Sequence, residues 1–140
     1  MAQVIAKGTQ SASVPTEKLV NVALWVLQIG AAGMFLMVGF LKLSGNPQLV
    51  GLFKAICLGQ WFRYLTGTLE VGGAILLLIP RTSGLAALML AGVMVGAVIT
   101  HVVIVGGSPL VATILLIVTG LVAWGRRQRT MNLIRGLRSR

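Results

Sequence analysis

Four long apolar segments dominate the sequence, and short polar or proline-containing breaks separate them. The first runs from about Lys18 to Leu43, and the others cover about 62–79, 83–105 and 109–124. A helix that crosses a bilayer needs about 20 mostly apolar residues. These segments are apolar on almost every face, which is unusual for a helix in water. The pattern therefore predicts four transmembrane helices.

A shorter segment, residues 48–58, lies between the first and second apolar segments. Four apolar residues recur along it at helical spacing: Leu49, Leu52, Phe53 and Ile56. The segment is too short to cross a membrane. We expect an amphipathic helix that lies in the interface or covers the mouth of the bundle, with Trp61 and Tyr64 at headgroup level.

The predicted fold class is all-α, a transmembrane four-helix bundle with a short amphipathic helix between spans 1 and 2. We expect a polar leader at 1–17, the transmembrane domain at 18–125 and a basic amphipathic cytoplasmic tail at 126–140. Composition agrees, because 56% of the 140 residues are hydrophobic and only 10% are charged. That is too apolar for a water-soluble domain of this length.

The formal net charge of +10 is concentrated at one end of the chain. Six of the twelve basic residues fall in the last fifteen positions: Arg126, Arg127, Arg129, Arg135, Arg138 and Arg140. Basic residues next to a span orient the protein and bind anionic headgroups. We therefore expect these arginines to face lipid phosphates, while nothing in the sequence resembles a nucleic-acid-binding module.

The distribution of lysine and arginine also predicts the orientation. Nine basic residues belong to one side of the predicted bundle, namely Lys7, Lys18, Arg81 and the six tail arginines. Three belong to the other side: Lys42, Lys54 and Arg63. The positive-inside rule then predicts a multi-pass protein of the inner or plasma membrane with both termini in the cytoplasm.

The chain has only two acidic residues, and one of them, Glu70, lies inside an apolar segment. A lone carboxylate in hydrocarbon is costly, so it is expected to find a cation or a hydrogen-bond donor. Lys42 and His101 lie at matching predicted depth on two other spans, and Thr66 and Thr100 could add hydroxyl groups. The five residues form a predicted polar cluster, either a ligand-binding pocket open to the outer face or a purely structural hydrogen-bond network.

Span 1 also carries a comparatively polar stripe of residues seven apart: Asn21, Gln28, Phe35 and Lys42. Gly92 and Gly96 form a G-x-x-x-G pair on span 3, which favours close helix packing within the bundle over a homodimer face. Cys57 is the single cysteine, so no intrachain disulfide can form. Glu70 and His101 supply at most two ligands, so no metal site is assigned.

Three stretches resemble the DoxX-like family of small four-span membrane proteins. They are GFLKLSGNP at the end of span 1, LTGTLEVGGAILLLIP in span 2 and MVGAVITHVVIVGG in span 3. The resemblance covers about 19–125 and maps the family's characteristic polar positions onto Lys42, Glu70 and His101. It implies membrane subunits of redox or oxidative-stress complexes in some branches and assembly factors in others.

Three functions remain open at this point. The first is an accessory subunit of a membrane redox or oxidative-stress complex, with an outer-leaflet pocket for a quinone-like or lipid-like ligand. The second is a non-enzymatic scaffold or assembly chaperone for other membrane protein subunits, and the third is a small transporter. No motif carries electrons, so no catalytic residue or resident cofactor is assigned, and independent catalysis is not expected.

Overall fold

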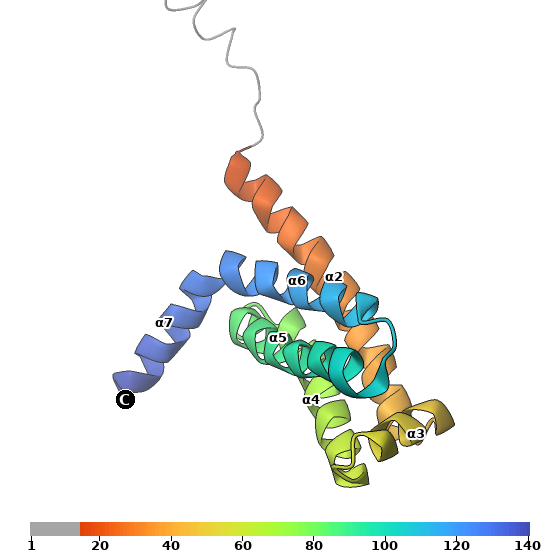
Figure 1. Ribbon diagram of the computed structural model, residues 1–140. Helices are drawn as coiled ribbons and strands as arrows, with labels where there is room; N and C mark the ends of the chain where they lie inside the picture. Colours follow the sequence, from red (N-terminus) through yellow and green to blue (C-terminus); the bar gives the residue numbers. More distant parts are fainter. Residues whose placement is uncertain (1–14) are drawn as a thin grey trace, which may run out of the picture.

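The computed structural model describes residues 15–140, and this part of the chain is helical except for short connections (Figure 1). It contains six α-helices and one π-helical segment. They are α2 (Thr16–Leu43), α3 (Pro47–Ala55), α4 (Gln60–Leu78), α5 (Ser83–Thr100), η1 (His101–Val105), α6 (Leu110–Gly125) and α7 (Arg127–Arg138). The all-α prediction is correct. The predicted leader lies largely outside the described residues.

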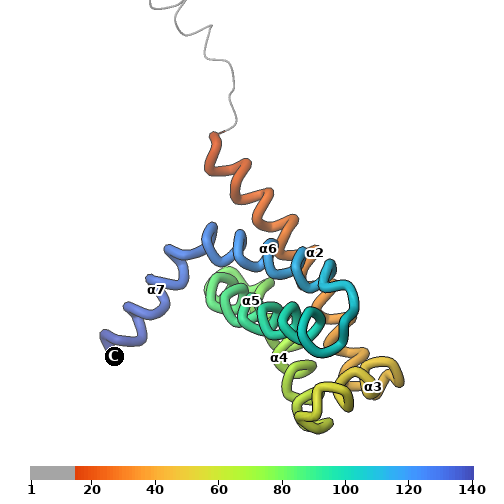
Figure 2. Tube along the Cα trace, in the orientation of Figure 1, coloured from red at the N-terminus to blue at the C-terminus, as the bar shows by residue number. Residues whose placement is uncertain are grey.

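The helices pack as two pairs that cross one another (Figure 1 and Figure 2). Helix α2 lies along α4, and α5 lies along α6, while α4 and α5 connect the two pairs. Helix α3 lies across one end of the assembly, next to the start of α4. At the other end α7 leaves α6 at a bend of 62°.

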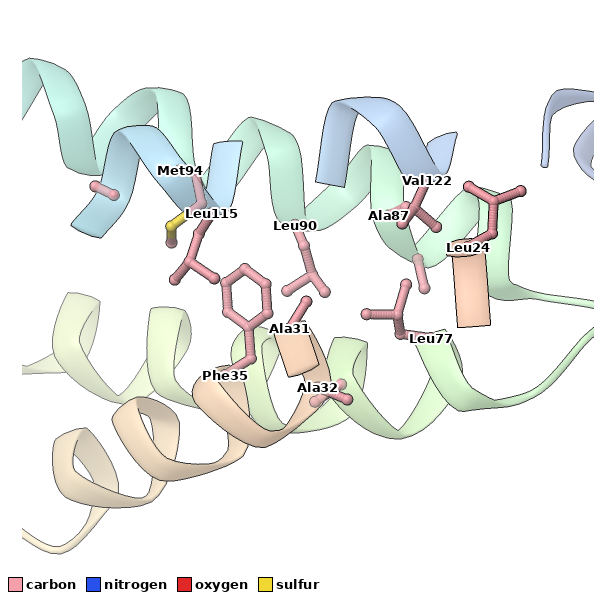
Figure 3. Packing of buried hydrophobic residues seen from close by; sticks show 13 residues of the cluster. Leu24, Ala31, Ala32, Phe35, Leu77, Ala87, Leu90, Met94, Leu115 and Val122 are labelled. Carbon is pink, nitrogen blue, oxygen red and sulfur yellow. The ribbon is translucent and has the colours of Figure 1, made fainter. Parts of the chain in front are cut away.

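The interior of the bundle is filled by side chains from all four long helices. Phe35 of α2 is fully buried and points between α5 and α6, where it lies near Leu90, Met94 and Leu115 (Figure 3). Small residues of the core, such as Ala31 and Ala87, let the helix backbones approach closely.

Many large apolar side chains lie on the outside of the molecule, as expected for a protein surrounded by lipid. Examples are Val26, Phe40 and Val103, which are 65%, 67% and 73% exposed. By length and hydropathy alone, Thr16–Leu43 and Ser83–Val105 could each cross a membrane, and the bent pair of α6 and α7 could form a third span. Lipid is therefore the solvent of this surface.

Helix α4 is less apolar than these helices, although its 19 residues are long enough to cross a membrane. The reason is that it carries Arg63 and Glu70, and both of these side chains are buried against other helices. An intramembrane charge that faces the bundle interior is the usual arrangement in membrane proteins.

The helix boundaries agree with the predicted spans to within a few residues. Helix α4 ends at Leu78, directly before the Pro80 turn, and α6 begins at Leu110 after Pro109. The sequence did not predict that span 3 ends as a π-helix. Gly106, at a φ of +68°, closes that segment because its N–H bonds to the His101 carbonyl at 2.9 Å.

The prediction that Gly92 and Gly96 mediate close helix packing is wrong. A Cβ atom at either position would meet nothing within 4 Å, and both glycines line a cavity instead. The close contact is between Gly39 of α2 and Gly67 of α4. A Cβ on Gly67 would lie 3.2 Å from the Gly39 carbonyl oxygen and 3.1 Å from Lys42 Cβ. This contact brings Lys42 against α4.

Candidate functional site

A buried ion pair lies where α2 crosses α4, with Lys42 on α2 and Glu70 on α4. Lys42 Nζ donates a hydrogen bond to Glu70 Oε1 at 2.5 Å, and Glu70 is fully buried. Lys42 is 9% exposed. The sequence predicted Lys42 or His101 as the partner of Glu70, and in the structure the partner is Lys42. The charge of the carboxylate is compensated inside the bundle, as its position in an apolar segment requires.

One oxygen of this carboxylate has no partner in the described part of the chain. Glu70 Oε2 is buried and accepts no hydrogen bond, whereas Oε1 is bonded to Lys42. A buried carboxylate oxygen without a donor is unfavourable by about 1–3 kcal/mol or more. A donor group that reached this oxygen would therefore be stabilising.

The ion pair lies at the wall of a cavity of about 560 Å³. Six side chains with polar groups line it: Lys42, Thr66, Glu70, Thr100, His101 and Ser108. The remaining lining is almost wholly apolar and includes Phe35, Leu52, Phe53 and Leu115. All five residues of the predicted polar cluster thus line one cavity. Its size and its mainly apolar lining are those of a small-molecule site.

The amphipathic segment covers one side of this cavity. All four apolar residues of its predicted face, Leu49, Leu52, Phe53 and Ile56, line the cavity, and Phe53 is only 4% exposed. Lys42 Nζ lies 5.8 Å from the centroid of the Phe53 ring, a cation–π geometry. Helix α3 ends earlier than predicted, at Ala55, because Cys57 adopts a φ of +61°.

His101 begins the π-helical segment and is half-buried at the same cavity. Its Nδ1 lies 2.8 Å from the carbonyl oxygen of Ala97. A carbonyl oxygen only accepts, so Nδ1 carries the proton, and Nε2 is left for a group in the cavity. No hydrogen bond joins His101 to Glu70 within residues 15–140. The two residues line the same cavity but are not hydrogen-bonded to each other in this part of the chain.

Thr66 and Thr100 do not hydrogen-bond to Glu70, contrary to what their depth suggested. The Thr66 hydroxyl donates to carbonyl groups of Phe62 and Arg63, and the Thr100 hydroxyl donates to Gly96 at 2.8 Å. Both hydroxyl groups therefore satisfy their own helix backbone, as threonines in apolar helices commonly do. They line the cavity but add no donor to the carboxylate.

Arg63 also belongs to the site, although the sequence pattern did not predict it there. It is 3% exposed, its Nη1 donates to the Lys42 carbonyl, and its Nε donates to Gln60 at 2.8 Å. Gln60 in turn donates to the Val50 carbonyl of α3 at 3.3 Å. Arg63 lies seven residues before Glu70, a spacing that puts both on one face of α4 and could have identified it.

A second polar cluster lies toward the opposite end of α2, and the sequence did not predict it either. Arg126 is 4% exposed, its Nε donates to Gln28 at 2.8 Å and its Nη1 donates to Asn21 at 2.7 Å. Gln28 is fully buried and donates to the Leu77 carbonyl at 2.8 Å. The prediction that all tail arginines face phosphates is therefore wrong for Arg126, which joins α2 to the end of α6.

The polar stripe on α2 explains both clusters. Gln28, Phe35 and Lys42 are all buried, and Asn21 bonds to Arg126. The stripe therefore faces the bundle from Gln28 to Lys42, as its seven-residue spacing predicted, whereas the Asn21 end is exposed. Among residues 15–140 no group of three or more histidine, cysteine, aspartate or glutamate side chains could hold a metal ion.

These features define a small multi-pass helical membrane protein with a mainly apolar internal cavity and a buried ion pair. The model of the DoxX-like family matches residues 26–125, which is most of the chain. The protein therefore belongs to the DoxX-like family. No curated protein and no solved structure gave a match.

Proposed function

We propose that this DoxX-like protein binds an amphipathic quinone-like or lipid-like molecule in the cavity beside Lys42 and Glu70. On this proposal, the polar head of the ligand reaches Glu70 Oε2 and His101 Nε2. Its apolar part lies against the α3, α5 and α6 side of the cavity. The chain would act as an accessory subunit of a membrane redox or oxidative-stress complex, a role suggested by its family.

One observation carries this proposal: an unpartnered buried carboxylate oxygen at a largely apolar cavity of about 560 Å³. A hydrogen-bond network with a purely structural role has no need of an open volume beside it. Ligand sites in general combine an apolar wall with a few polar groups that converge. Gly92 and Gly96 add to this argument, because both lie at the cavity where a side chain would occupy open space.

The proposal includes four spans with both termini in the cytoplasm. Under this orientation the cavity opens toward the outer leaflet, since Lys42 and α3 lie at the end of α2 away from the N-terminus. The excess of arginine and lysine at the opposite end supports it.

The test compares two glycine substitutions of the same kind. Gly96→Leu places a side chain in the cavity, whereas Gly33→Leu places one on α2 where no atom lies within 4 Å and no cavity residue is replaced. Leucine is a better helix former than glycine, so both variants are expected to fold. Binding of the quinone analogue decylubiquinone and retention of native lipid or quinone in mild detergent are measured.

We expect the wild-type protein and Gly33→Leu to bind equally. Gly96→Leu should bind at least about tenfold more weakly, because it removes the volume that the ligand occupies. Equal retention by Gly96→Leu and Gly33→Leu would sink the proposal. So would co-purification of other membrane proteins with no retained small molecule, which would favour the scaffold role.

A further inference from the structure

A second cleft lies at the other end of α4, between the α4–α5 connection and α7. It has a volume of about 510 Å³ and is separate from the Lys42–Glu70 cavity, with which it shares no residue. The residues that matter for its chemistry are Arg81, Arg129, Arg140, Asn132, Leu133 and Leu137. Segments about fifty residues apart in sequence therefore form one concave surface.

The cleft is strongly basic and has no acidic residue in its lining. Arg129 Nη1 donates to the Pro80 carbonyl at 3.1 Å, which holds one side of the cleft in place. Arg81 and Arg140 are exposed, and neither makes an ion pair within residues 15–140. The one ion pair found there uses Glu70, in the other cavity. Three guanidinium groups thus surround a volume whose lining side chains carry no negative charge.

The position and walls of the cleft suggest which anion it takes. It lies where α4 and α6 end, beside a helix whose side chains Met131, Ile134 and Leu137 are exposed. A basic helix with an exposed apolar face lies in the bilayer interface. Leu133 and Leu137 line the cleft together with the arginines, so a charged headgroup and the first carbons of its acyl chains would both find partners.

We propose that this cleft is a specific site for the phosphate headgroup of an anionic phospholipid. Arg81 and Arg140 would hold the phosphate oxygens, and Arg129 would complete the ring of donors. Guanidinium groups bind phosphate through charge-assisted, often bidentate hydrogen bonds. Basic pockets at the cytoplasmic ends of membrane helices bind anionic headgroups in this way. A defined site differs from diffuse attraction because only some of the tail arginines would matter.

The chain offers a control of equal charge on the same helix. Arg135 and Arg138 are exposed residues of α7 that do not line the cleft. The experiment therefore compares Arg81→Gln/Arg140→Gln with Arg135→Gln/Arg138→Gln in the full-length protein. Native mass spectrometry measures the binding of phosphatidylglycerol and of phosphatidylcholine with the same acyl chains, and inorganic phosphate is added as a competitor. Thermal unfolding in lipid-free micelles checks that each variant is folded.

We expect one phosphatidylglycerol to bind in preference to phosphatidylcholine. The Arg81→Gln/Arg140→Gln variant should bind it about tenfold more weakly, because two charge-assisted hydrogen bonds are lost. The control pair should stay within about twofold, because exposed charges outside the site are screened by salt. If both pairs weaken binding equally, the attraction is diffuse and the proposal is wrong. If phosphatidylcholine binds as tightly as phosphatidylglycerol, or if inorganic phosphate binds through Arg81 and Arg140 more tightly than phosphatidylglycerol does, the assignment to an anionic phospholipid is also wrong.

Discussion

At the scale of single residues, the buried charge of Glu70 would be strongly unfavourable without a partner. Lys42 compensates it directly, and Arg63, two turns earlier on α4, donates a hydrogen bond to the backbone carbonyl of Lys42. Removing one member of a buried pair leaves the other charge unpaired, which is far worse than removing both. A single neutral substitution such as Glu70→Gln therefore affects folding as well as any ligand.

This asymmetry gives a prediction about stability. Lys42→Met should destabilise the protein by about 3–5 kcal/mol, whereas Lys42→Met/Glu70→Leu should recover most of that loss. Thermal unfolding in mild detergent measures both, with Lys54→Met as a control because Lys54 is exposed. A double variant that is no more stable than Lys42→Met would contradict the assignment of the pair.

At the scale of elements, α3 is the helix whose role depends most on its contacts. It has only 9 residues, and an isolated helix of that length is unstable in water. Two features hold it in place. The Asn46 side chain accepts a hydrogen bond from the Gln48 N–H at 3.0 Å and caps the helix. The ring of Phe53 packs against the ring of Phe62 on α4, with a distance of 6.0 Å between the ring centroids.

Phe53→Asp should therefore detach α3 from the bundle. The loss of the buried ring corresponds to about 1.5–3 kcal/mol, and the new carboxylate would lie beside the cavity. Ala55→Asp is the matched control, because Ala55 is exposed on the same helix. Thermal stability in detergent and proteolysis of residues 44–59 report the change. Equal stability of the two variants would show that α3 does not depend on Phe53.

The tail is the other element that the structure places differently from the sequence. Arg126 is buried against α2, and Gly84 of α5 lies so close to the start of α7 that a Cβ there would clash with the Thr130 hydroxyl. The start of α7 is thus part of the packed molecule. Removal of the tail after Trp124 would cost tertiary contacts as well as surface charge.

At the scale of the whole molecule, the orientation in the membrane can be tested with the natural cysteine. Cys57 is free and exposed, and it lies between α3 and α4, at the end of the molecule opposite to the start of α2 and to α7. The proposed topology predicts that a membrane-impermeant maleimide labels Cys57 in intact cells. In a Cys57→Ser background, Thr16→Cys and Ser139→Cys should react only after the membrane is opened. Labelling of either of these from outside would overturn the topology.

The sequence by itself determined the helical elements, their order and which helix carries each charge. Long apolar runs, prolines and a few glycines place the helices because they act through local backbone chemistry and bilayer thickness. The polar stripe of α2 was also readable, since Gln28 and Lys42 are rare polar residues on an apolar helix.

Only the tertiary structure decided how each helix is rotated and which groups meet. When a helix is apolar on nearly every face, its sequence pattern does not predict which side faces the neighbouring helices. For this reason the sequence could not show that Glu70 pairs with Lys42 while His101 bonds to Ala97, or that Gly92 and Gly96 face a cavity. Arg126 turns inward for the same reason, because Asn21 and Gln28, about a hundred residues earlier, supply its partners.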